Sequence, residues 1–174
     1  MTEVAGRLRT TVEALSVAGI DFVIVGGVAA ALQGATRVTQ DVDILFDRDP
    51  ANRSLLATFL VAHHARPRGA WPDDVEFVLD AVVLDRCELL TLETDLGLLD
   101  VMARVPGIGD FADALRSADV MALDEHRVLV LSVEGLIRAK EATARPKDLD
   151  ALHELRALAD VQRAEADARA EPLT

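Results

Sequence analysis

The sequence predicts a mixed α/β (α+β) fold in which helices flank one mixed β-sheet. Two observations predict it: strand and helix patterns are interspersed along the chain, and a glycine-containing turn inside residues 87–103 implies an antiparallel hairpin. A third is that 51% of the 174 residues are hydrophobic, which is enough for a real core. We expect one domain over residues 1–164 and a frayed charged tail over residues 165–174.

The first half of the chain reads as helix, strand, helix, strand, helix. Apolar residues recur at helical spacing before Gly19, and Gly26-Gly27 separates a buried strand from a short helix. Pro50 stands near the start of the third helix, where proline is tolerated. The expected elements are helix 2–18, strand 21–25, helix 28–33, a polar connector 36–40, strand 41–46 and helix 50–65.

The second half is less regular at its start. Pro67, Gly69 and Pro72 make residues 66–71 the loosest stretch of the chain. Ser132 has the side chain of a helix N-cap. The expected elements are helix 73–84, hairpin strands 87–93 and 98–103, helix 110–118, one or two short strands within 120–131, helix 133–144 and a last helix from 147 to about 164.

Composition excludes several classes of protein. A formal net charge of −12 argues against broad, sequence-independent docking on nucleic acid, which needs Lys and Arg. The single cysteine, Cys87, cannot form an intrachain disulfide or a cysteine-based zinc site. We find no signal peptide and no apolar run of membrane-spanning length, so we expect a cytoplasmic protein without a membrane partner.

The densest chemical signal is Gly26-Gly27 followed by Asp41-Val42-Asp43. Side chains alternate along a strand, so Asp41 and Asp43 point to the same face and form a hard-oxygen site suited to Mg²⁺. Glycines at a strand–helix junction let the backbone approach a phosphate. Each half alone also fits a tight turn or a solvated strand edge. Together, the two halves indicate nucleotide chemistry.

Asp100 is a third candidate acid. It shares a strand face with Leu98 and Met102, and an acid is costly on an apolar face unless it is paired or bound to metal. An exposed strand face is the alternative explanation. If the face is buried, Asp41, Asp43 and Asp100 form a three-carboxylate site for phosphoryl transfer.

Residues 25–34 and 37–44 together resemble the signature of the nucleotidyltransferase superfamily. The sequence is most similar there to small bacterial members related to abortive-infection and toxin–antitoxin nucleotidyltransferases. Later blocks continue the resemblance around Asp100, Lys140 and residues 145–148, so that it spans about residues 20–155. One departure is Ala151, which stands where relatives often carry a second acid, with Asp150 adjacent.

The resemblance implies a metal-dependent nucleotidyltransferase that moves a nucleoside monophosphate from an NTP to an acceptor. It implies Mg²⁺ or Mn²⁺ as cofactor and a possible toxin or antitoxin partner. The acceptor stays open among RNA, a protein hydroxyl and a small molecule. The expected catalytic and metal-binding residues are Asp41, Asp43 and Asp100, and the expected nucleotide-binding residues are Gly26, Gly27, Arg37, Thr39, Lys140 and Lys147.

Each of these residues also has a purely structural explanation. Lys140 fits a surface lysine as well as a phosphate contact, and Arg37 and Thr39 could simply shape the connector. His63 and His64 lack metal-ligand spacing. Two rival functions also stay open, namely an inactive binding module with the same fold and another Asp-x-Asp metal enzyme such as a nucleotide-sugar transferase.

Overall fold

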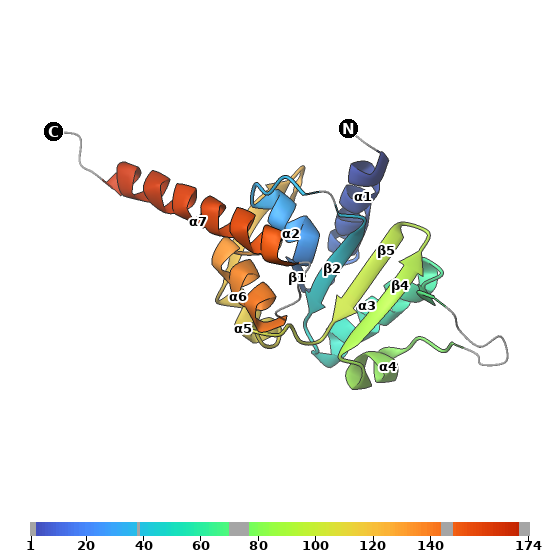
Figure 1. The fold of residues 1–174 in the computed structure, drawn as a ribbon. Coiled ribbons are helices and arrows are strands. Elements are labelled where there is room, and N and C mark those ends of the chain that lie inside the picture. Colours follow the sequence, from blue (N-terminus) through green and yellow to red (C-terminus); the bar gives the residue numbers. More distant parts are fainter. Residues whose placement is uncertain (1–2, 38, 70–76, 144–147, 171–174) are drawn as a thin grey trace.

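The computed structural model describes residues 3–37, 39–69, 77–143 and 148–170. Its centre is a seven-stranded sheet in the order β3-β4-β5-β2-β1-β7-β6, flanked by helices (Figure 1), which confirms the predicted mixed α/β class. The elements in chain order are α1 (Glu3–Val17), β1 (Phe22–Val25), α2 (Gly26–Leu32), β2 (Asp41–Phe46), α3 (Pro50–Ala62), β3 (Arg66–Pro67), α4 (Ala81–Arg86), β4 (Leu89–Thr94), β5 (Gly97–Met102), α5 (Phe111–Leu115), β6 (Ala118–Leu123), β7 (His126–Leu131), α6 (Val133–Thr143) and α7 (Leu149–Ala170).

Parallel and antiparallel pairs combine in this sheet. β2 lies between β1, to which it is antiparallel, and β5, to which it is parallel. β1 is also parallel to β7. The two hairpins, β4–β5 and β6–β7, form the outer parts of the sheet and are antiparallel, as the glycine-turn signal predicted for the first of them. The parallel pair of β2 and β5 is what brings distant segments of the chain side by side.

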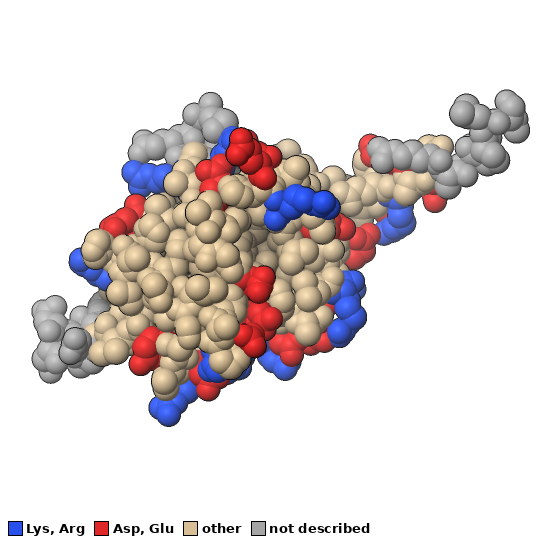
Figure 2. Space-filling model, turned by 180° about the vertical axis from the view of Figure 1, so that it is seen from behind, with Lys and Arg blue, Asp and Glu red and all other residues tan. Residues whose placement is uncertain are grey.

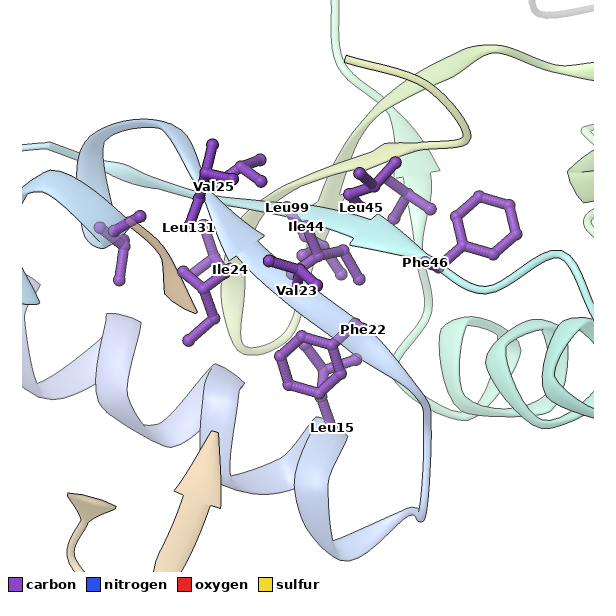
Figure 3. Packing of buried hydrophobic residues seen from close by; sticks show 14 of the residues in the cluster. Leu15, Phe22, Val23, Ile24, Val25, Ile44, Leu45, Phe46, Leu99 and Leu131 are labelled. Carbon is purple, nitrogen blue, oxygen red and sulfur yellow. The ribbon is translucent and has the colours of Figure 1, made fainter. Parts of the chain in front are cut away.

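Aliphatic side chains from the central strands form the core (Figure 3). Val23, Ile24, Ile44, Leu45 and Leu99 are fully buried. All four residues of β1 are buried, which fits a strand that is covered on both faces. Helix α1 packs against β2, β5 and β7.

One buried polar side chain ties helix α3 to the sheet. The amide oxygen of Asn52 accepts a hydrogen bond from the Asp21 backbone N–H at 2.8 Å. Its amide nitrogen donates to the backbone carbonyls of Asp21 at 3.0 Å and Asp47 at 2.8 Å. Asn52 therefore fixes the start of β1 and the end of β2 relative to α3, which sets the position of the two central strands.

The structure corrects the expectations for residues 66–86. Arg66 and Pro67 are not loop residues, because they form β3 and pair with β4. The helix expected over residues 73–84 is α4, which begins only at Ala81, and residues 70–76 lie outside the described part of the chain. Asp80 is the physical reason for the late start. Its side chain caps the helix by accepting from the N–H groups of Val82 and Val83.

Other element boundaries moved by smaller amounts. Helix α2 begins at Gly26 rather than after Gly27. Ser132 accepts a hydrogen bond from the Gly135 backbone N–H at 3.2 Å, as expected of an N-cap. Helix α7 projects from the body of the protein and runs to Ala170, past the expected end near residue 164 (Figure 1). Alanines alternating with charged residues favour helix there, and the division of the chain at residue 164 stays a prediction.

The side of the molecule opposite to the view of Figure 1 appears in Figure 2. On this side Lys and Arg side chains are scattered, mostly beside Asp and Glu, and the described residues form no continuous basic patch. Electrostatic attraction for a polyanion is therefore weak on this side. In the part of the chain that the structure describes, helices lack the length and apolarity needed to cross a membrane.

Candidate active site

Three carboxylates converge at the centre of the sheet. The parallel register of β2 and β5 sets Asp43 directly beside Asp100, and Asp41 lies two residues before Asp43 on the same face. One carboxylate oxygen from each of the three side chains lies within 4.8 Å of the other two. The sequence predicted this convergence, and the structure shows the side chains together.

Strand alternation explains why all three acids emerge on one side. Val42, Ile44, Leu99 and Val101 alternate with the aspartates along β2 and β5, and they are buried in the core. Burying these four side chains leaves the acids on the opposite face. That face borders an open cleft of about 560 Å³, which the start of α2 and the residues Leu136, Ala139, Lys140 and Thr143 of α6 also line.

The electrostatics of the cluster are unfavourable for three free carboxylates. Burial and, after it, the charges of Asp41 and Asp100 raise the pKa of Asp43 from 3.8 to about 7, although a hydrogen bond from the Gly27 backbone N–H and the charge of Arg68 lower it. Burial also raises the pKa of Asp100, although the neighbouring Arg68 opposes this. The cluster therefore favours a bound proton or a bound cation.

Gly26 lets the chain approach Asp43 closely. Its backbone has φ +62°, a conformation that residues with a side chain rarely adopt. A Cβ atom at this position would lie 2.9 Å or less from three side-chain atoms of Asp43. The adjacent Gly27 is equally confined, because a Cβ there would lie 2.6 Å from the Cβ of Thr39. Both glycines line the cleft, and the Gly27 N–H, expected to bind phosphate, is bonded to Asp43 here.

Arg68 is the residue at the site that sequence reasoning missed. It follows β3, and its guanidinium forms an ion pair with Asp100 and a second one with Asp41 at 3.4 Å. The sequence signals around it, Pro67 and Gly69, indicated only a loop. No local sequence pattern indicates that this segment pairs with β4. The position of Arg68 at the site therefore depends on the strand pairing alone.

Both predicted connector residues line the pocket next to the cleft, and of the two only Thr39 also lines the cleft. Thr39 lines the cleft, and its hydroxyl donates to Asp41 Oδ1 at 2.8 Å. It therefore orients an aspartate in this structure. Arg37 is exposed and lines a neighbouring pocket, together with Glu154 and Ala151.

The predicted lysines also differ from each other. Lys140 lines both cavities, and its Nζ forms an ion pair with Asp148 Oδ1 at 3.0 Å. Lys147 lies outside the described residues. His64 pairs with Asp95 at 2.6 Å on an exposed surface, and neither of these two residues lines the cleft.

The residues present fit a divalent cation. Three hard carboxylate oxygens within 4.8 Å of one another match the ligands that Mg²⁺ and Mn²⁺ prefer. Burial is the largest cause of the raised pKa of Asp43, and repulsion from Asp41 and Asp100 adds to it; a bound cation relieves this repulsion. Asp41, Asp43 and Asp100 could therefore hold a metal ion.

Comparison with known protein families gives a match to one of them. The sequence profile of the family described as aminoglycoside-2''-adenylyltransferase matches residues 7–163. A search of curated proteins finds no significant match. A similar solved structure is that of the antibiotic-resistance factor ANT(2'')-Ia in solution, with 18% identity over 95% of this chain and 92% of that chain and a TM-score of 0.49.

We predict that the metal-free protein loses stability as the pH rises from about 4 to about 7, the range between the unfolded and folded pKa values of Asp43. A folded-state pKa above the unfolded value means that the unfolded chain gives up this proton first, so the contribution of Asp43 to stability falls across the window. Asp43→Asn should melt several degrees higher than the wild type above pH 7, since 1 kcal/mol corresponds to roughly 2–4 °C at this size.

The measurement is the melting temperature in EDTA across this pH range. Asp167→Asn, on the exposed distal part of α7, removes one carboxylate charge elsewhere and should show no such gain. An Asp43→Asn variant whose melting curve follows that of the wild type at every pH would contradict the electrostatic account of the cluster.

We also predict that Gly26→Ala removes metal binding. Gly19→Ala is the matched control, because Gly19 has φ +70° but has no atom within 4 Å of an added Cβ. Both variants should lose about 1–2 kcal/mol through left-handed backbone strain, and Gly26→Ala should lose more because its Cβ overlaps the Asp43 side chain. Only Gly26→Ala should lose the rise in melting temperature that Mn²⁺ gives the wild type. If Mn²⁺ raised the melting temperatures of the two variants equally, Gly26 would not be needed for metal binding at the carboxylates.

Proposed function

The chain belongs to the aminoglycoside-2''-adenylyltransferase family, and from this premise we propose that it transfers AMP from ATP to a hydroxyl group of an aminoglycoside. Membership of the family confirms the nucleotidyltransferase class predicted from the sequence. The observation that carries the finer proposal is the convergence of Asp41, Asp43 and Asp100 in one open cleft.

The proposed reaction is a displacement at phosphorus. The acceptor oxygen forms a bond to the α-phosphorus of ATP, and the bond from that phosphorus to the bridging oxygen of pyrophosphate breaks. Asp100 accepts the proton of the attacking hydroxyl, because its carboxylate lines the cleft beside the other two acids, where the acceptor would meet the α-phosphorus. Pyrophosphate leaves with the electron pair of the broken bond.

Asp41 and Asp43 supply the ligands of a divalent cation, with Asp100 completing the set. Thr39 supports this role by holding Asp41 Oδ1 in place. When bound, Mg²⁺ neutralises phosphate charge and lowers the pKa of the attacking hydroxyl. Gly26 and Gly27 line the cleft that takes the triphosphate, and Lys140, paired with Asp148, lines the same cleft and supplies a positive charge for the phosphates.

An acidic protein suits a cationic acceptor. The formal net charge of −12 favours the approach of polyamine-bearing sugars such as aminoglycosides. Asp148 and Glu154 line the pocket next to the carboxylate cluster. Arg37 and Lys140 line the same pocket, so the preference for a small cationic acceptor over RNA rests on the net charge of the whole chain.

A toxin–antitoxin role remains a separate hypothesis. It came from the resemblance to toxin–antitoxin nucleotidyltransferases, and the family that matches the chain is instead named for small-molecule modification. Co-purification of the tagged chain from its native cells would test it, and absence of a stoichiometric protein partner would count against it.

The transferase proposal predicts an adenylylated aminoglycoside. Purified protein is incubated with Mg²⁺, each of the four NTPs and a panel of aminoglycosides, and products are followed by mass spectrometry. We expect ATP to give an AMP adduct on at least one aminoglycoside. Asp43→Asn and Asp100→Asn should lower the rate by roughly 10²–10⁴-fold, the range typical of groups acting directly in proton transfer or charge stabilisation.

Asp95→Asn is the matched control, because it is the same chemical change at an exposed ion pair outside the cleft. It should retain nearly the full wild-type rate. If a folded Asp43→Asn variant retained the wild-type rate, the assignment of the metal site would be wrong. Transfer to a protein or RNA with no aminoglycoside product would overturn the assigned acceptor class.

A further inference from the structure

Arg68 occupies an unusual position for a basic side chain in this protein. Its backbone N–H donates to the Thr91 carbonyl at 2.8 Å, which extends the pairing of β3 with β4 by one residue. In the sheet register Thr91 lies opposite Asp100, and Asp100 lies opposite Asp43. Arg68, Thr91, Asp100 and Asp43 therefore form one row across four strands, and the arginine reaches along this row into the cluster.

The guanidinium makes contacts that a metal ion would need. Arg68 Nη2 binds Asp100 Oδ1, and Nη1 lies 3.4 Å from Asp41 Oδ2. The other oxygen of Asp41 already accepts the hydroxyl of Thr39. Both oxygens of Asp41 are therefore engaged, so a cation that takes Asp41 and Asp100 as ligands competes directly with Arg68.

Lys140, the other basic residue that lines the cleft, is paired with an acid outside the carboxylate cluster. Within the described residues, the cleft is lined by two basic side chains, Arg68 and Lys140, and Lys140 is paired with Asp148 at 3.0 Å. Arg68 thus offsets part of the carboxylate charge in this structure. Its Nε is buried and has no hydrogen-bond partner among the described residues, which leaves one donor of the guanidinium group unsatisfied in this arrangement.

We infer that Arg68 exchanges partners during nucleotide binding: it holds Asp41 and Asp100 while the metal site is empty, and it moves to the triphosphate when metal and nucleotide occupy the carboxylates. A guanidinium binds phosphate oxygens through two parallel N–H donors, which suits the same group to both partners. The residue would then contact the leaving pyrophosphate. This inference rests on the proposed function.

The test measures binding and needs no turnover. Mn²⁺ binding to the nucleotide-free protein is measured by isothermal titration, followed by inorganic pyrophosphate in the presence of saturating Mn²⁺. Arg68→Ala should bind Mn²⁺ roughly tenfold more tightly, because a competing cation is gone. The same variant should bind pyrophosphate roughly tenfold more weakly, because a bidentate phosphate contact is lost.

Two further variants separate direct occupation from general charge. Arg66→Ala removes the same charge from β3 at an exposed residue that forms no ion pair with the three aspartates in the described structure, and it should leave both affinities unchanged. Arg68→Lys keeps the charge but lacks the fork that bridges two carboxylates. It should tighten Mn²⁺ binding and weaken pyrophosphate binding in the same directions as Arg68→Ala, and it provides the measurement if the alanine variant does not fold.

The outcomes distinguish this inference from the proposed function. If the wild type binds neither Mn²⁺ nor pyrophosphate, the proposed function fails and the partner exchange falls with it. If the wild type binds both and the Arg68 variants bind Mn²⁺ no more tightly, only the partner exchange is overturned. Unchanged pyrophosphate binding in the Arg68 variants would likewise overturn the exchange. An Arg68→Lys variant with wild-type Mn²⁺ affinity would overturn direct occupation of the metal site, because it would show that only the positive charge of residue 68 affects Mn²⁺ binding.

Discussion

The parallel pairing of β2 with β5 is the constraint on which the rest of the site depends. It places Asp43 beside Asp100 and leaves Asp41 one pleat away, so three acids share a small volume at the centre of the sheet. The apolar alternates of these strands are locked in the core, so the acids cannot move to another face without exposing those side chains. Hydrophobic burial therefore stabilises an arrangement that the carboxylates alone would not adopt.

Several neighbouring features follow from this crowding. Burial and the neighbouring acids raise the pKa of Asp43 to about 7 even though the Gly27 N–H lowers it. Thr39 and Arg68 each engage an oxygen of Asp41. Gly26 keeps clear the space that Asp43 fills. A site with this much repulsion is set up to gain stability from a cation and, through it, from nucleotide phosphates, which links the packing of the sheet to the proposed chemistry.

The fold was predictable where a local pattern carried the information. The boundaries of β2 match the sequence-based expectation, because alternating acids and aliphatics define both its ends and its faces. The expectation failed at α4. Residues 77–80, which were expected to be helical, are not, and the N-cap Asp80 fixes the start of the helix at Ala81. The expectation also failed at Arg66 and Pro67, since proline signals a break but does not tell which strand a short segment joins.

The sequence by itself determined that Asp41 and Asp43 share a face, because side chains alternate along a strand. For Asp100 it fixed only the face shared with Leu98 and Met102 and left open whether that face is buried. It also placed two glycines at the junction between β1 and α2. Only the tertiary structure decided which strands are neighbours, and thus that Asp43 meets Asp100. It alone brought Arg68 into the cluster and committed the Gly27 N–H to Asp43, because strand order and long side-chain reach depend on pairings between segments that no local pattern records.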